Sequence, residues 1–205
     1  MRIAINQPYF IPYSGYFRLL AATDLFVVLD SVQHIRRGYL HRNKLLNRAG
    51  NPEWLTLPIK PCARDTLIKD LEFSDNKDEL WKKQLKKFPI FDGGEFPLYG
   101  TPSKFITKSL QGICEQLKLP CHIAYSSELD IPPGLKGQDR IIAICNHFHA
   151  TEYINAPGGK KLYNPDAFRL YGMKLKFLPE WKGSYLSVLQ HIEEPGLREE
   201  IVSQC

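Results

Sequence analysis

Apolar residues occur along this chain in two patterns that alternate from one end to the other. Short runs of apolar and β-branched residues predict strands, and apolar residues three or four positions apart predict amphipathic helices. The expected strands are residues 2–6, 24–30, 53–59, 120–127, 151–155 and 173–179. The expected helices are residues 14–23, 76–88, 101–119, 137–150 and 165–172. This alternation predicts a single α/β domain over residues 1–205, with a mostly parallel central sheet flanked by helices.

Three polar or glycine-rich loops follow expected strands. They comprise residues 7–16, 30–43 and 155–163. In an open parallel sheet, ligands bind beyond the carboxyl ends of the strands, where such loops leave the sheet. We therefore expect the three loops to meet at one ligand pocket.

The first loop lies in the stretch NQPYFIPYSGYFRLL, residues 6–20, which is dense in aromatic residues, proline and glycine. Aromatic residues at this spacing are often simply core residues, and the stretch then forms a packed turn. Alternatively, they line a pocket, because tyrosine stacks on a sugar or base and keeps a hydroxyl group for a hydrogen bond. Under the pocket hypothesis the binding residues here are Gln7, Tyr9, Tyr13, Gly15 and Tyr16.

The second loop, DSVQHIRRGYLHRN, is rich in basic residues. Arginine binds phosphate and carboxylate groups through two parallel hydrogen bonds. We expect Gln33, Arg36, Arg42 and Asn43 to bind substrate, and His41 and Asp30 to handle a proton in catalysis. The alternative is a solvated basic face, with Asp30 capping a helix.

The third loop, NAPGGKKLY, offers backbone N–H groups for an anion at two adjacent glycines. A tight turn explains a glycine pair equally well. Under the binding hypothesis the contributing residues are Asn155, Gly158, Gly159 and Tyr163.

Composition narrows the classes of partner and compartment. The chain has 43% hydrophobic and 24% charged residues and a formal net charge of +5. Outside the basic loop the charges are mixed and no nucleic-acid reader motif occurs, so we expect no nucleic-acid partner. No apolar run reaches the ~18–20 residues of a membrane span. The first residues do not resemble an export leader, so we expect a cytoplasmic location and five reduced cysteines. Histidine and cysteine spacing predicts no metal site, and the sequence identifies neither a cofactor nor an oligomeric state.

Four separated blocks of the chain resemble the WbqC-like protein family of bacteria, in the family's order from residue 3 to about 190. They are INQPYFIPYSGYFRLLAATDLFVVLDSVQHIRRGYLHRNKLL, WLTLPI, GQDRIIAIC and YINAPGGKKLYNPDAF. Members occur in gene clusters for O-antigen and other surface polysaccharides. The resemblance implies a transferase that moves a small acyl or aminoacyl group onto a nucleotide-linked amino sugar.

The opening block is also distantly similar to the nucleotidyltransferase superfamily, in which a His-x-Gly-His turn holds a triphosphate at a helix N-terminus. Here the turn reads Tyr13-Ser14-Gly15-Tyr16, so both imidazoles are replaced by phenols. Adenylyl transfer by the usual route is therefore not expected. This departure favours an alternative function, a non-catalytic accessory protein that binds a nucleotide or sugar nucleotide.

Overall fold

Five parallel strands form the central sheet of the computed structural model, which describes residues 1–205. The strand order is β5-β2-β1-β6-β7, and every neighbouring pair is parallel. The strands are β1 (Arg2–Asn6), β2 (Leu25–Val28), β5 (Ile123–Tyr125), β6 (Glu152–Asn155) and β7 (Lys174–Phe177). The predicted α/β class with a parallel sheet is confirmed, although most of the strands are shorter than expected.

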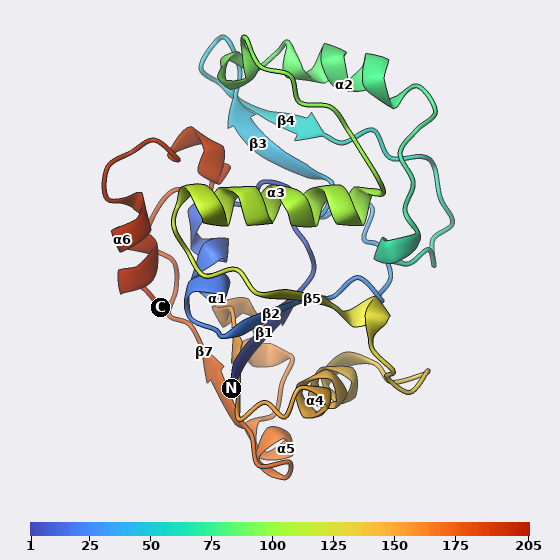
Figure 1. Ribbon diagram of the computed structural model, residues 1–205, viewed down its shortest axis with the longest axis vertical. Coiled ribbons are helices and arrows are strands. Elements are labelled where there is room, and N and C mark those ends of the chain that lie inside the picture. The colour runs from blue at the N-terminus through green and yellow to red at the C-terminus, as the bar shows by residue number, and fades with distance from the viewer.

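Alternate strand residues divide the core between the two faces of the sheet. Ile3, Ile5 and Val27 pack on the face covered by α4 (Gly137–His147) and α5 (Pro165–Arg169). The intervening strand residues pack on the other face, which is covered by α1 (Arg18–Ala21), α3 (Pro102–Gln116) and α6 (Leu197–Ser203). Because successive strand side chains point in opposite directions, a short apolar run suffices to anchor both layers (Figure 1).

The helix α3 illustrates how local sequence sets an element. The Thr101 side chain accepts a hydrogen bond from the Lys104 backbone N–H, and Pro102 occupies the first turn. Both features favour a helix start at this position. The apolar side of the helix, with Phe105, Ile106 and Leu110, is buried in the larger core.

A separate two-stranded hairpin lies beyond α3, on the side away from the sheet (Figure 1). It pairs β3 (Arg42–Leu46) with β4 (Pro52–Thr56) in antiparallel register, and α2 (Lys77–Leu85) packs on β4. The expected strand at 53–59 therefore exists in shorter form, but outside the parallel sheet. The expected loop 30–43 also ends differently, because its last two residues begin β3, where buried and exposed side chains alternate.

The expected helix at 14–23 is divided in the structure. Ser14–Phe17 form a single 3₁₀ turn, and α1 follows with only four residues. The Thr23 hydroxyl donates to the Leu19 carbonyl at 2.6 Å, a local bond that competes with continuation of the helix. None of the helices combines the length and apolar character needed to cross a membrane.

Candidate functional site

The strand order identifies one point of the sheet as the expected ligand site. From β1 the chain passes to β2 and β5 on one side, and later returns to β6 on the other side of β1. The loops that leave β1 and β6 consequently diverge, which opens a crevice at the carboxyl ends of these two strands. Asn6 and Asn155 are the last residues of the two strands and therefore stand at its floor.

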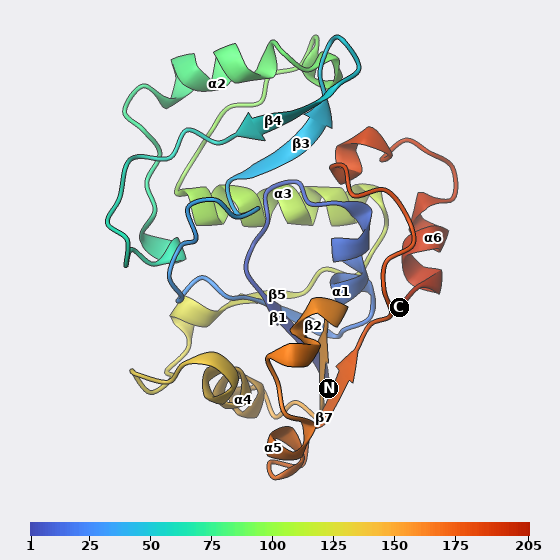
Figure 2. The same cartoon turned by 180° about the vertical axis from the view of Figure 1, so that it is seen from behind.

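A cavity of about 390 Å³, the strand-end cavity, occupies this crevice. Its volume lies in the ~300–1,000 Å³ range of small-molecule sites. Seen from behind, the turn of residues 157–161 lies beside α1 above this end of the sheet (Figure 2). The lining residues that carry polar groups or form the close turns are Asn6, Gln7, Tyr9, Tyr13, Gly15, Tyr16, Arg18, Asn155, Gly158, Gly159 and Tyr163.

The two strand-end asparagines are oriented in the same way. Asn6 Oδ1 accepts a hydrogen bond from the Gln7 N–H at 2.9 Å, and Asn155 Oδ1 accepts one from the Ala156 N–H at 2.8 Å. Each oxygen is thereby satisfied by its own chain, while neither Nδ2 group has a hydrogen-bond partner in the protein. The cavity floor therefore presents two amide donors to a ligand.

A second cavity of about 310 Å³ continues from the first and shares Tyr9 and Tyr13 with it. Tyr39 and Tyr185 complete an aromatic wall, with ring centroids 6.2 Å from Tyr9 and 5.0 Å from Tyr13, respectively. We call the two cavities together the tyrosine recess. Burial raises the pKa of Tyr9 and of Tyr13, so both phenols are protonated at neutral pH and act as hydrogen-bond donors or acceptors.

Two residues of the opening loop are fixed by the protein itself. The Tyr16 hydroxyl donates to the Gln7 carbonyl at 2.8 Å, and its ring is buried. Gly15 lies against Trp181, whose Cγ would be only 2.6 Å from a Cβ added at that position. These two residues shape the recess wall, whereas Tyr9 and Tyr13 keep hydroxyl groups without a protein partner.

Arg18 is a lining residue of the strand-end cavity that the sequence did not single out. Only 1% of its surface is exposed, and none of the ion pairs in the protein includes it. Its Nε donates to the Gly15 carbonyl, and its Nη1 donates to the carbonyls of Pro179 and Gln204. A buried guanidinium without a carboxylate gives the cavity a positive charge that an anionic ligand would balance.

The turn after β6 places its two glycines differently. Gly159 is buried, and its lack of a side chain lets the Asn155 side chain lie directly against its Cα. No heavy atom lies within 4 Å of the Cβ position at Gly158, so that residue borders open space. Tyr163 closes this side of the cavity, with its ring edge against Tyr153 and Phe168.

Asp30, expected to handle a proton, lies outside the tyrosine recess and is 2% exposed. Its carboxylate accepts hydrogen bonds from the Ser126 hydroxyl, the Ser127 hydroxyl and the Ser127 backbone N–H, at 3.1, 2.7 and 2.9 Å. These bonds connect the end of β2 to the turn after β5. In this position Asp30 holds two strand ends together.

The basic loop is split between several places. Gln33 is exposed and donates to the Arg64 carbonyl, and Arg42 stacks on Trp54 with 4.4 Å from its guanidinium carbon to the ring centroid. Arg36 and His41 meet in another cavity, with His34. The loop reaches the strand-end cavity only through Ile35. Gln33, Arg36 and Arg42, expected to bind substrate where the three loops meet, therefore do not line the tyrosine recess.

Asn43 lines the aromatic part of the recess but uses its side chain internally. Its Nδ2 donates to the Ile11 carbonyl at 2.7 Å, and the Ser187 hydroxyl donates to the same oxygen at 2.8 Å. Ile11 has φ of +36°, which is unfavourable for a β-branched residue. Asn43 and Ser187 thus hold the strained centre of the opening loop in place.

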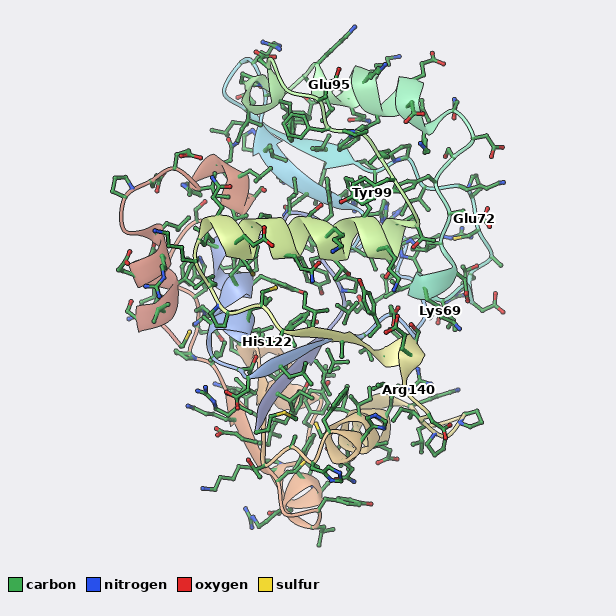
Figure 3. All side chains as sticks on the ribbon, viewed as in Figure 1. Lys69, Glu72, Glu95, Tyr99, His122 and Arg140 are labelled. Atoms are coloured by element: carbon green, nitrogen blue, oxygen red, sulfur yellow. The ribbon has the colours of Figure 1, made fainter.

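A larger cavity, of about 500 Å³, lies between α2 and residues 94–98, remote from the strand ends. Glu95 marks its position at the top of Figure 3. Its charged lining residues include an ion pair between Lys77 and Asp78 at 3.0 Å, and no residue at the carboxyl end of a parallel strand lines it. The tyrosine recess is therefore the stronger candidate. No group of three metal-binding side chains occurs in the structure.

Comparison with known proteins agrees with the resemblance carried by the sequence blocks. An uncharacterized protein of Mycobacterium tuberculosis (strain ATCC 25618 / H37Rv), Rv1507c, is 25% identical over 181 residues, which cover 82% of this chain and 77% of that protein. No solved structure matches the chain. The model of the WbqC-like protein family matches residues 7–89 and 99–189, which include all four tyrosines of the recess, Asn155 and the glycine pair of the turn after β6. The chain therefore belongs to the WbqC-like protein family.

Proposed function

We propose that this protein binds a nucleotide-linked amino sugar in the tyrosine recess and transfers a small acyl or aminoacyl group to it, in the synthesis of surface-polysaccharide precursors. One observation carries the proposal. The recess lies at the divergence of the loops from β1 and β6, and it combines four tyrosines with two free amide donors and a buried arginine.

The groups of the recess suit the parts of such a ligand. The rings of Tyr9, Tyr13, Tyr39 and Tyr185 offer faces for a sugar or a base. Arg18 supplies the positive charge for a diphosphate, and the open surface at Gly158 lets a phosphate approach the backbone. Family membership supports the surface-polysaccharide context.

The same groups suit acyl transfer to an amine. When the amine attacks an acyl carbonyl, negative charge develops on the carbonyl oxygen, and neutral donors aimed at that oxygen stabilise the transition state. The Nδ2 groups of Asn6 and Asn155 and the protonated phenols of Tyr9 and Tyr13 are such donors. The amine proton leaves with the departing group of the donor molecule, since Asp30 and His41 do not line the recess.

The placement of Asp30 and His41 also favours a second candidate function. A recess that offers hydrogen-bond donors but no carboxylate or imidazole fits a protein that binds a nucleotide or sugar nucleotide without transforming it. An assay for product formation separates the two functions.

Thermal unfolding with UDP, UDP-N-acetylglucosamine and a UDP-linked amino sugar tests binding. A ligand at a hundred times its Kd stabilises the native state by about 2.7 kcal/mol, so the proposal predicts a clear rise of Tm with the sugar nucleotides. The Tyr13→Ala variant should lose this rise. If no nucleotide raises Tm, both candidate functions fail.

Mass spectrometry of the sugar nucleotide, after incubation with acyl-coenzyme A or aminoacyl donors, tests the transfer itself. The transferase predicts a product heavier by the acyl group. Binding without product across these donor classes would leave the accessory function as the better account.

A further inference from the structure

Outside the tyrosine recess, a cavity of about 240 Å³ lies between the loop of residues 34–41 and residues 59–62. Its polar lining residues are His34, Arg36, His41 and Lys60, and we call it the histidine cavity. No acidic side chain lines it. Its lining includes residues of the basic loop that do not line the strand-end cavity.

The two histidine rings have no hydrogen-bond partner in the protein. Their centroids are 5.2 Å apart at an interplanar angle of 71°, and Nδ1 of each ring is buried without a partner. His34 is 6% exposed. Because Nδ1 is enclosed in both rings, Nε2 is the nitrogen left to face the cavity. Neither Nε2 has a hydrogen-bond partner in the protein, so both remain available to a ligand in the cavity.

Arg36 supplies the charge beside the two rings. Its Nη2 donates to the Cys62 carbonyl at 2.6 Å, which holds the guanidinium at the cavity wall, and no carboxylate pairs with it. Lys60 stands at the same cavity, but its Nζ already lies 3.7 Å from Glu72 and 3.5 Å from Asp75. Arg36 is therefore the cation whose charge is left uncompensated at this site.

The protonation state of the rings fits an anion that accepts hydrogen bonds. Burial, His34 and Arg42 together lower the pKa of His41 to about 4, and burial and Arg36 lower the pKa of His34. At neutral pH each ring is therefore uncharged and carries one N–H. Two N–H donors and a guanidinium around one cavity match the oxygens of a phosphate group.

We propose that the histidine cavity binds a phosphate group, with Nε2–H of His34 and His41 and the guanidinium of Arg36 as its donors. The site is separate from the tyrosine recess and does not depend on the function proposed for it. Ile35, between His34 and Arg36, lines the strand-end cavity, so one short segment borders both sites.

Calorimetric titration with inorganic phosphate and with N-acetylglucosamine 1-phosphate, at constant ionic strength, tests the proposal. Both probes share the phosphate group, and the tighter one identifies whether the site takes free phosphate or a sugar phosphate. Arg36→Ala should weaken binding about tenfold or more. Arg37→Ala is the matched control, because this neighbouring exposed arginine does not line the cavity, and its effect should be less than about twofold.

Imidazole ¹⁵N spectra of the same protein detect phosphate at the histidine rings directly. If the two histidines had only a structural role, phosphate would not shift their resonances. Phosphate should shift the Nε2 resonances of His34 and His41 and leave those of exposed His122 in place. Unchanged affinity in Arg36→Ala, or unshifted His34 and His41 resonances at saturating phosphate, would overturn the proposal. Tyr13→Ala should leave phosphate binding intact, so failure of this site and failure of the tyrosine recess are distinguishable.

Discussion

At the residue scale, the opening loop shows how one stretch combines packing and exposed chemistry. Tyr16 and Gly15 are packed into the protein, whereas Tyr9 and Tyr13 present free hydroxyl groups to the recess. The packed-turn hypothesis and the pocket hypothesis therefore each describe different residues of the same segment. The packed residues hold the exposed ones in position.

Replacing Gly15 by alanine should destabilise the protein by about 1–3 kcal/mol, because the added methyl group overlaps Trp181. Chemical unfolding measures this loss. Gly158→Ala is the matched control, since no atom lies within 4 Å of its Cβ position, and its stability should change by less than about 0.5 kcal/mol. Equal stability of the two variants would contradict the packing described for Gly15.

His41 should make the stability depend on pH in a defined direction. Its pKa is lowered to about 4 in the folded state, from an ordinary value near 6.5, chiefly by burial. Between these pH values the unfolded chain binds more protons, so stability decreases as the pH falls from about 6.5 toward about 4. Urea unfolding over this range should show a weaker decrease in His41→Phe, which keeps an aromatic ring beside His34.

The control for this pH dependence is His122→Gln, which changes an exposed histidine that does not line the histidine cavity. This variant should keep the wild-type dependence. If the free energy of unfolding had the same pH dependence in His41→Phe and wild type, the burial of His41 would not contribute to that dependence.

At the element scale, the β3–β4 hairpin supports the recess from outside the sheet. The Asn43 side chain on β3 donates to the Ile11 carbonyl. The Phe10 backbone N–H donates to the carbonyls of Tyr39 and Leu40, just before β3. Asn43→Ala should therefore cost about 1–3 kcal/mol, because it leaves buried carbonyl groups with fewer donors. It should also weaken sugar-nucleotide binding, although the fold persists.

Unfolding and ligand titration of Asn43→Ala can be compared with Lys44→Ala on the same strand. Lys44 is exposed, and its contact with Trp54 predicts a loss of less than about 1 kcal/mol with no change in ligand affinity. If the two variants weakened ligand binding equally, the hairpin would have no specific role in the recess.

The hairpin also shows where prediction from the sequence stopped. The parallel strands were predictable because each contains a short continuous or alternating pattern of apolar residues, and the loop ends Asn6 and Asn155 followed from them. The pairing of β3 with β4 depends on the turn at residues 47–51, where the Asn47 side chain accepts two backbone N–H groups. That turn removes Arg42 from the pocket and places it on Trp54, which no local pattern indicates.

At the scale of the whole molecule, the recess brings together segments from both ends of the chain. The Tyr185 ring packs against Tyr13, and Arg18 donates to the carbonyls of Pro179 and Gln204. The C-terminal helix α6 accordingly lies beside α1, the helix that begins with Arg18 (Figure 1). Arg18 had one local signal, a charged residue within an apolar helical segment. Of its three carbonyl partners only Gly15 is close in the sequence, whereas Pro179 and Gln204 are 161 and 186 positions away. Only the fold reveals that it has no carboxylate partner.

The most direct test of the central claim is a ¹H–¹⁵N spectrum of the labelled protein titrated with UDP-N-acetylglucosamine. If the ligand binds at the strand ends of β1 and β6, the largest shifts fall on the backbone amides of Gln7, Gly158 and Gly159. Trp81 and Phe96, at the cavity beside α2, should stay in place. Shifts confined to that cavity, or no shifts at saturation, would contradict the assignment of the tyrosine recess as the ligand site.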